Sequence, residues 1–532
     1  MQSAYDWIVV GSGFGGSVSA LRLAEKGYRV AVLEKGRRFG RDDFAENNTD
    51  VKRWMWAPAL GARGIYQMSF FRHVTILHGV GVGGGSLVYA NTLPRPKEAF
   101  FRASSWAHLA DWERELSPHY ETAKTMLGAT RFPGDTPGDR VLEQIAADIG
   151  RSEHFHKADV AVFFGKAGVE VDDPYFEGKG PKRVGCTMCG ACMTGCRVGA
   201  KNTLDQNYLY LAEKLGVTVL PETQVTAVRH GEDGTYSVET KHSITGEKGE
   251  TFTAPHVVLS GGVMGTIPLL LAMKEDPAGY PKLSARVGRS VRTNNESITN
   301  VFAPGAGQDF SRGVAITSIL HTDEHSHLEP VRYGAGSNFY KALLTPHAPS
   351  KSAFLRILGS MARWLFAPIT WMHQLATRRF SEESQILLYM RTLEETLTLE
   401  LGRSLYTGFR RGLVTRVADR ASAPTAYLPE ASALAERFAA KTGGVVSSLF
   451  TEALTGAPTT AHILGGACMG KDADEGVIDA RHEVFGYPGL YVIDGSAVSA
   501  NPGVNPSLTI TALAERAMSF VPEAVKTTPG PR

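Results

Sequence analysis

The first forty residues restrict the fold more than any other segment. An apolar run over residues 5–10 leads into Gly11-Ser12-Gly13-Phe14-Gly15-Gly16. Helical spacing of apolar residues follows over 17–26, and a second apolar run over 28–33 ends at Glu34. This order of strand, G-x-G-x-x-G turn, helix, strand and acid is typical of the Rossmann-type dinucleotide-binding unit. The sequence therefore predicts an α/β fold that holds a dinucleotide.

Each residue type in this motif has a physical reason. Gly11 makes the turn, Gly13 lets the backbone approach a pyrophosphate, and Gly16 lets helix and strand pack closely. The helix that starts here offers free N–H groups to phosphates. Glu34 can accept hydrogen bonds from both ribose hydroxyls and would repel a 2′-phosphate. The alternative is a tight turn with no ligand.

Length and charge narrow the class of protein. The chain has 532 residues, which favours two domains over one core. It carries 56 Lys and Arg against 54 Asp and Glu, so no basic excess points to nucleic acid. No apolar stretch is long enough to cross a bilayer, and the start lacks the pattern of a signal peptide. The expected location is the cytoplasm.

Three later segments resemble the signatures of the glucose–methanol–choline (GMC) oxidoreductase family. They are a glycine loop at 79–89, the run at 461–466 that begins Ala-His-Ile-Leu-Gly-Gly, and the C-terminal segment 490–516. The pattern is most similar to the cholesterol oxidase-like branch. The resemblance implies a Rossmann-type FAD-binding domain interleaved with an α+β substrate domain built on an antiparallel sheet.

The resemblance also implies which residues hold FAD. Asp494 and Gly495 would meet the flavin ribityl and pyrophosphate, and Val225 would contact the adenine through its backbone. We expect non-covalent FAD unless His78 is attached to it. Tyr89-Ala90-Asn91 differs from the Asn-Gly-Gly run of the steroid oxidases. The full predicted cofactor set is Gly11, Gly13, Phe14, Gly16, Glu34, Gly81, Gly84, Gly85, Ser86, Val225, Asp494, Gly495, Asn505 and Pro506.

Oxidising an alcohol requires a base for the hydroxyl proton and a hydride acceptor beside the carbinol carbon. His462 suits the base because a histidine titrates near neutral pH. In the resembling enzymes the positions of His462 and Asn505 form the catalytic pair. The alternative is a core histidine and a helix cap. Steroid oxidases also use a pocket glutamate; Glu394 and Glu395 are the candidates, although a solvated strand end is the favoured interpretation for both.

The motifs divide the chain into interleaved parts. We expect an FAD-binding domain over 1–300, with 96–180 partly on the substrate side, a substrate domain over 301–454, and a return to the FAD-binding domain over 455–532. Strand-like runs at 314–320, 386–390 and 396–401 predict an antiparallel sheet that roofs the flavin.

Four cysteines form a C-x₂-C-x₂-C-x₃-C cluster: Cys186, Cys189, Cys192 and Cys196. This is the bacterial ferredoxin spacing, with Arg197 in place of the usual proline. An iron–sulfur cluster is the leading hypothesis. Zinc, a redox disulfide and free thiols are the alternatives.

Residues 353–380 form an apolar insert without any acid. Pro368 predicts a break, and therefore two helices. One interpretation is an interfacial helix pair that meets a membrane through Trp364, Phe366 and Trp371, with Arg356, Arg363, Arg378 and Arg379 for anionic head groups. The alternative is a helix packed on the body or on a second copy of the chain in a homo-oligomer.

These expectations favour FAD-dependent oxidation of a small lipophilic alcohol, either sterol-like or long-chain. Two other functions stay open. One is a dehydrogenase of sugars or other polar alcohols that relays electrons through an iron–sulfur cluster. The other is a GMC-fold lyase or decarboxylase.

Overall fold

The predicted N-terminal motif begins a five-stranded parallel sheet. The computed structural model describes residues 5–418 and 424–525. β1 (Trp7–Val10), α1 (Phe14–Glu25) and β2 (Val30–Leu33) follow the predicted order. The strand order is β12-β2-β1-β16-β27. The other strands are β12 (Thr218–Leu220), β16 (His256–Leu259) and β27 (Leu490–Val492). Because β27 comes from near the C-terminus, both ends of the sequence build this sheet.

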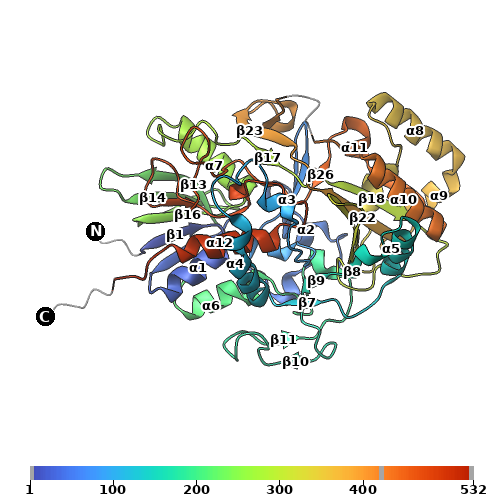
Figure 1. Ribbon diagram of the computed structural model, residues 1–532, viewed down its shortest axis with the longest axis horizontal. Helices are drawn as coiled ribbons and strands as arrows, with labels where there is room; N and C mark the ends of the chain where they lie inside the picture. Colours follow the sequence, from blue (N-terminus) through green and yellow to red (C-terminus); the bar gives the residue numbers. More distant parts are fainter. Residues whose placement is uncertain (1–4, 419–423, 526–532) are drawn as a thin grey trace.

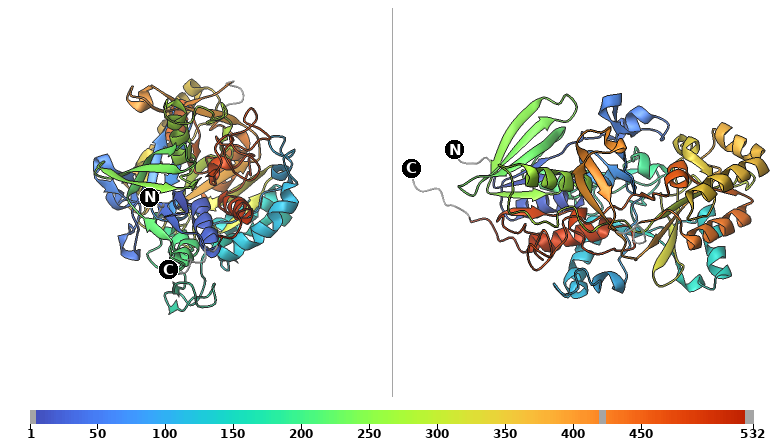
Figure 2. Two further views of the ribbon diagram at one scale, coloured as in Figure 1. Left: turned by 90° about the vertical axis from the view of Figure 1, so that its left-hand side faces the viewer. Right: turned by 90° about the horizontal axis from the view of Figure 1, so that it is seen from above.

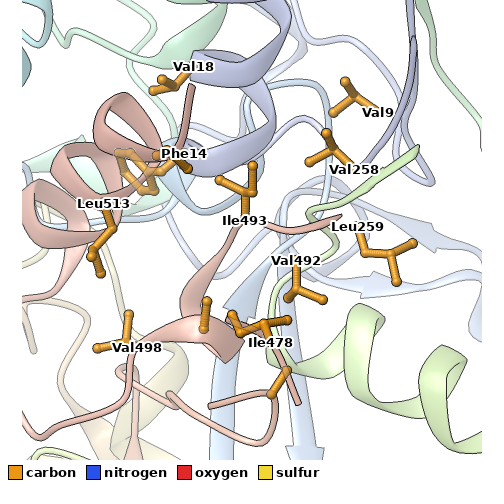
Figure 3. Close-up of a cluster of buried hydrophobic side chains, with 14 of the residues drawn as sticks. Val9, Phe14, Val18, Val258, Leu259, Ile478, Val492, Ile493, Val498 and Leu513 are labelled. Carbon is orange, nitrogen blue, oxygen red and sulfur yellow. The ribbon is translucent and has the colours of Figure 1, made fainter. Parts of the chain in front are cut away.

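Helices from both ends of the chain complete this core. α1 packs against α6 (Tyr208–Lys214) and α12 (Ser507–Ser519), and α12 packs against α4 (Trp112–Met126). Figure 3 shows Val9, Phe14, Val258, Val492 and Leu513 meeting in one cluster. Full burial of one such side chain stabilises the fold by about 1.5–3 kcal/mol. The core therefore links segments that are far apart in sequence.

An antiparallel sheet of three strands stands beside the parallel one. It consists of β13 (Thr223–His230), β14 (Tyr236–His242) and β15 (Lys248–Ala254). α7 (Val263–Glu275) packs on β13. The first and last described parts of the chain both lie at this end of the molecule (Figure 1).

The other end is built on a seven-stranded sheet whose paired strands are antiparallel. In spatial order its strands are β21 (Leu344–Pro346), β25 (Val445–Leu449), β18 (Ser297–Phe302), β22 (Ser384–Arg391), β20 (Ser326–Val331), β19 (Ser318–His321) and β8 (Phe155–Lys157). α5 (Pro137–Asp148) and α10 (Pro429–Thr442) cover one face. The expected architecture of a Rossmann-type domain with an antiparallel substrate sheet is confirmed.

One expected strand lies elsewhere. The run at 396–401 forms β23 (Thr396–Gly402), which pairs with β17 (Val291–Arg292) and β24 (Gly412–Arg416) rather than with the seven-stranded sheet. Leu397 and Leu399 alternate along β23, and both are buried in the FAD-side core against α7. The prediction that this run roofs the flavin was wrong, because an apolar alternation does not specify which sheet a strand joins.

The apolar insert forms α8 (Ala353–Phe366) and α9 (Pro368–Ala376), with the predicted break before Pro368. This helix pair lies at the end of the molecule opposite the termini (Figures 1 and 2). α11 (Phe450–Thr455) packs against α8. Within residues 5–418 and 424–525, no helix is long and apolar enough to cross a membrane.

Short elements fill the space between the two ends. They are α2 (Val51–Trp54), β3 (Trp56–Ala57), β4 (Ala62–Arg63), β5 (Tyr66–Phe70), β6 (Thr75–Gly79), α3 (Glu98–Phe101), β7 (Ala129–Arg131), β9 (Asp159–Ala161), β10 (Glu170–Val171), β11 (Arg183–Val184) and β26 (Thr459–Thr460).

Candidate active site

A cavity of about 670 Å³ lies between the five-stranded parallel sheet and the seven-stranded sheet. One end is lined by the glycine motif, and the other by side chains of the seven-stranded sheet. Strand pairing explains why the predicted motifs converge here. β6 leads into the glycine loop, and β26 precedes His462; the two strands pair in parallel, with Thr459 opposite Thr75.

The glycine-lined end leaves no room for larger residues. Gly11 has φ +99°, and a Cβ there would lie 2.4 Å from the carbonyl oxygen of Ser260. A Cβ on Gly84 would lie 2.6 Å from the Cα of Gly13. The backbones of the glycine loop and the N-terminal turn therefore lie in direct contact, and the Gly83 N–H also donates to Ser12 Oγ at 3.0 Å. Such a surface lets a diphosphate approach main-chain N–H groups closely.

Two buried carboxyl groups flank this surface. Glu34 accepts hydrogen bonds from Ser12 Oγ at 2.7 Å and from Gly36 N at 2.7 Å. Asp494 accepts from Thr266 Oγ1 at 2.6 Å and from Gly262 N at 2.8 Å. Burial raises the pKa of Asp494, although these donors oppose the shift. Both side chains line the cavity, where each can accept hydrogen bonds from sugar hydroxyls.

The predicted cofactor residues divide into two groups. Those that line the cavity are Gly11, Gly13, Phe14, Glu34, Gly84, Gly85, Val225, Asp494, Gly495, Asn505 and Pro506. Gly16, Gly81 and Ser86 stand behind the wall instead. A Cβ on Gly16 would lie 2.0 Å from the Gly11 carbonyl oxygen, and Ser86 Oγ donates to the Gly83 carbonyl at 2.7 Å. These three residues shape the loops that face the cavity.

His462 reaches the cavity with a carboxyl group behind it. Its Nδ1 lies 3.0 Å from Oε1 of Glu296, the residue before β18. Thr460 Oγ1 and the Ala461 N–H donate to the same carboxylate. Burial disfavours the imidazolium, but the charge and the hydrogen-bonding contact of Glu296 outweigh this effect, so the pKa of His462 is raised. The imidazole is therefore held in one orientation and made a stronger base.

A second buried carboxyl group contacts Asn505. The Nδ2 atom of Asn505 lies 3.4 Å from Oε2 of Glu329 on β20. Burial raises the pKa of Glu329 to about 8, against the opposing charge of His462. The sequence reasoning missed both Glu296 and Glu329. A usable signal was the alternation His327-Leu328-Glu329, which places two polar side chains on one face of a buried strand.

The glutamates first considered for the pocket lie outside it. Glu394 forms an ion pair with Arg292 at 3.2 Å and accepts the Asn501 N–H at 2.8 Å. Neither Glu394 nor Glu395 lines the cavity. The favoured interpretation of a solvated strand end agrees with the exposure of Glu394. Glu329 does not line the cavity either, but it contacts Asn505, which does.

The described structure does not support a metal centre at the cysteine cluster. Cys186, Cys189, Cys192 and Cys196 surround a small cavity of about 20 Å³, with room for about one water molecule. Burial raises the pKa of Cys186 to about 12 and that of Cys192 to about 11. In the part of the chain that the structure describes, no group of three or more His, Cys, Asp or Glu side chains is arranged to hold a metal ion. The leading hypothesis of an iron–sulfur cluster is therefore not supported.

Comparison with known proteins agrees with this geometry. Residues 6–368 match the FAD dependent oxidoreductase family, and residues 402–514 match the GMC oxidoreductase family. A cholesterol oxidase of Mycobacterium tuberculosis is 43% identical over 99% of this chain and 93% of its own. The chain belongs to the GMC oxidoreductases. A cholesterol oxidase of Acinetobacter baumannii is 41% identical over 97% of this chain and 94% of its own.

A solved relative shows the same fold. The crystal structure of a pyridoxine 4-oxidase from Mesorbium loti covers 97% of this chain and 99% of its own, with a TM-score of 0.61 at 16% identity. The family matches and the cholesterol oxidase relatives show that the present chain is an FAD-dependent oxidoreductase that acts on alcohols. The glycine surface, Glu34 and Asp494 suit FAD, because they offer backbone donors to a diphosphate and acceptors to its hydroxyls.

Proposed function

We propose that the protein oxidises the hydroxyl group of a sterol-like or long-chain alcohol, with His462 accepting the hydroxyl proton. The observation that carries this proposal is the composition of the substrate end of the cavity. Apolar and aromatic side chains of the seven-stranded sheet and its flanks dominate it. They are Tyr66, Met193, Ile298, Ile316, Val331, Tyr333, Tyr340, Leu344, Phe380, Ile386, Leu388 and Leu449. A lipophilic molecule gains about 0.8 kcal/mol for each CH₂ buried on such a surface.

The polar groups at this end suit one hydroxyl. Bound FAD supplies the hydride acceptor. His462 takes the hydroxyl proton at the nitrogen that Glu296 leaves free, and Glu296 stabilises the resulting imidazolium. Asn505 lines the cavity beside His462 and can hold the substrate oxygen. A group placed in this way orients the carbinol carbon before the reaction.

The apolar walls of the cavity weigh against a sugar or another polar alcohol as the substrate. A sugar carries many hydroxyl groups, and burying them without partners is costly. The cysteine cluster offers no described metal site through which electrons could be relayed.

The experiment is anaerobic reduction of the bound flavin by candidate alcohols. Purified protein should release FAD on denaturation, and cholesterol or a long-chain alcohol in detergent should bleach the flavin absorbance. Glucose should leave it unchanged. Bleaching by glucose alone would replace this proposal with the polar-alcohol dehydrogenase.

We propose further that α8 and α9 bring the enzyme to its substrate at an anionic lipid surface. Their outer face is strongly apolar: Leu365 is 81% exposed, Phe366 88% and Ile369 83%. The remaining exposed members are Phe354, Leu355, Ile357, Leu358, Met361, Met372 and Leu375, with Phe450 and Leu454 on the neighbouring α11. We call these twelve side chains the apolar face. Monomeric soluble proteins rarely expose so large a contiguous patch.

Charge favours a membrane over other occupants of this face. No acid occurs over 351–381, while Lys351, Arg378 and Arg379 are exposed beside the helices. Three of the residues predicted for the interface have other roles. Trp371 is 3% exposed, Arg356 donates to backbone carbonyls including that of Ala453, and Arg363 pairs with Glu436 at 2.9 Å.

The apolar face also lies close to the substrate end of the cavity. Leu344 lines the cavity from β21, which packs against α8, and Phe380 lines it four residues after α9. Leu449 lines it directly before α11. A lipid that leaves the bilayer beneath these helices would therefore travel only a short way to the cavity.

A further inference from the structure

Three histidines continue from Glu329 across the seven-stranded sheet. His327 and Glu329 stand two residues apart on β20, so both side chains point to the cavity face. His321 on β19 is the registered partner of His327. His156 lies on the edge strand β8, where it pairs with Ile319, two residues from His321. The four side chains form a row from the middle of the sheet to its edge.

The spacing within this row is short throughout. Glu329 Oε1 lies 3.3 Å from His327 Nε2. The ring centroids of His327 and His321 are 5.7 Å apart, and those of His321 and His156 are 5.4 Å apart with the rings stacked. Glu329 and His327 are buried, whereas His321 and His156 are partly exposed. The row therefore starts behind the catalytic cavity and ends at the surface.

Unused polar atoms occur at each of the inner steps. Glu329 Oε1, His327 Nε2 and His321 Nδ1 are buried and have no hydrogen-bond partner among the described residues. Buried polar atoms are nearly always hydrogen-bonded in folded proteins, and the exceptions call for an explanation. A small rotation or a bridging water would join each of these atoms to the next. The proposed reaction at His462 and Asn505 does not otherwise use these three atoms.

The row is uncharged at neutral pH. Burial raises the pKa of Glu329 to about 8 and lowers the pKa of His327 and of His321 to about 3. Lys97 adds to the lowering at both histidines, and Arg131 acts in the same direction on His156, against Asp159. A protonated carboxyl and neutral imidazoles each have one donor and one acceptor. Each can accept a proton at one atom and release another.

We infer that Glu329, His327, His321 and His156 form the exit path for the proton that alcohol oxidation releases. The inference rests on the proposed function for the origin of that proton. Oxidation of R₂CHOH to R₂C=O removes a hydride, which the bound flavin accepts, and one proton, which His462 takes. The proton passes to Glu329, which donates its own to His327, and the transfer continues through His321 and His156 to water. Each group of the row ends with the same number of protons as it began with, so atoms and electrons balance.

The first test needs neither substrate nor turnover. Protonated Glu329 should give a carboxyl C=O band in the infrared spectrum, which Glu329→Gln removes. On mixing with D₂O this band should shift as the proton exchanges. His327→Phe should slow the shift by about 10²-fold, the lower end of what a positioned proton-transfer group contributes. An unchanged exchange rate would overturn the inference, whatever the enzyme's substrate.

The second test follows both products of one turnover. In wild-type holoenzyme with detergent-solubilised alcohol, a pH-indicator dye should report the proton together with flavin bleaching. In His327→Phe and in the surface variant His156→Phe, the dye signal should lag behind bleaching. The control is His347→Gln, a buried histidine that bonds Ser432 outside the row. Simultaneous signals in both row variants would exclude this path, whereas absence of bleaching in wild type would reject the proposed function instead.

Discussion

At the residue scale, the candidate site depends on carboxyl groups that never need to touch the substrate. Glu296 fixes and polarises His462, and Glu329 stands behind Asn505. The two carboxyls have different surroundings. Glu296 has Thr460 and Ala461 as donors. Glu329 has the long contact from Asn505, lies 3.3 Å from His327 Nε2, and has its pKa raised mainly by burial. The same residue type thus serves as an ion-pair partner in one place and as a protonated group in the other.

Replacing His462 should remove the base without removing the cofactor. His462→Ala should lower kcat by roughly 10²–10⁴-fold, the usual effect of losing a positioned acid–base group. FAD should stay bound, because the glycine surface and the hydrogen bonds that hold Glu34 and Asp494 do not involve His462. Stopped-flow flavin reduction measures the loss of rate, and the flavin spectrum shows whether FAD stays bound. Unchanged reduction would exclude His462 from proton transfer.

Replacing Glu296 should move the pH profile. The base must be neutral to act, so kcat/KM rises with pH as His462 loses its proton. Glu296 raises the pKa of His462, and Glu296→Gln removes that charge. The acid limb of the profile should therefore shift to lower pH. Glu394→Gln is the matched control, because Glu394 pairs with Arg292 away from the cavity, and its profile should equal that of wild type.

At the element scale, short-range patterns in the sequence predicted more than long-range pairings. The glycine turn, the helix after it and the proline break at Pro368 each appear as expected, because local backbone geometry decides them. The position of β23 could not be predicted, since it depends on which core accepts Leu397 and Leu399. Glu296 and Glu329 were missed for the same reason: they meet His462 and Asn505 only through pairing between distant strands.

The apolar face of α8, α9 and α11 should bind vesicles. We expect the protein to sediment with phosphatidylcholine vesicles that contain phosphatidylglycerol, and salt should weaken binding, because the Debye length is about 10 Å at 0.1 M. The triple variant Leu365→Ser, Phe366→Ser, Ile369→Ser should bind about 10²-fold more weakly if each side chain contributes about 1 kcal/mol. Arg378→Glu with Arg379→Glu should remove the salt-dependent part.

The control variant for this experiment also removes exposed apolar side chains, but at positions outside the apolar face. Leu60 is 82% exposed and Leu405 75% exposed, and neither belongs to the apolar face. Leu60→Ser with Leu405→Ser should bind vesicles as wild type does. If wild type ignores vesicles but forms a dimer that the triple variant dissociates, the apolar face is a subunit interface instead.

At the scale of the whole molecule, buried titratable groups are spread over both ends of the fold. Burial lowers the pKa of His327 to about 3 and those of His347 and His482 to about 4. Burial also raises the pKa of Glu329 and of Glu452 to about 8. His327 lies on strand β20, His347 directly follows β21, and His482 accompanies β27 of the parallel sheet, so no single site accounts for the effect. The free energy of unfolding should therefore depend on pH from two opposite directions.

The expected result is a stability maximum near pH 6.5. Below that value the unfolded histidines, with pKa near 6.5, bind protons that the folded protein excludes, so stability rises with pH from about 4 to 6.5. Unfolded glutamates lose their proton near pH 4.3, while buried Glu329 and Glu452 keep theirs to about 8, so these two lower stability as pH rises through that window. His78 and His321 add to the rise of stability with pH on the acid side, which outweighs the opposite effect of the glutamates below pH 6.5.

Urea midpoints measured from pH 5 to 8.5 would show the maximum. Glu452→Gln, which can keep the bond from the Thr459 N–H, should flatten the alkaline side; a slope unchanged by this variant would mean that Glu452 ionises in the folded protein.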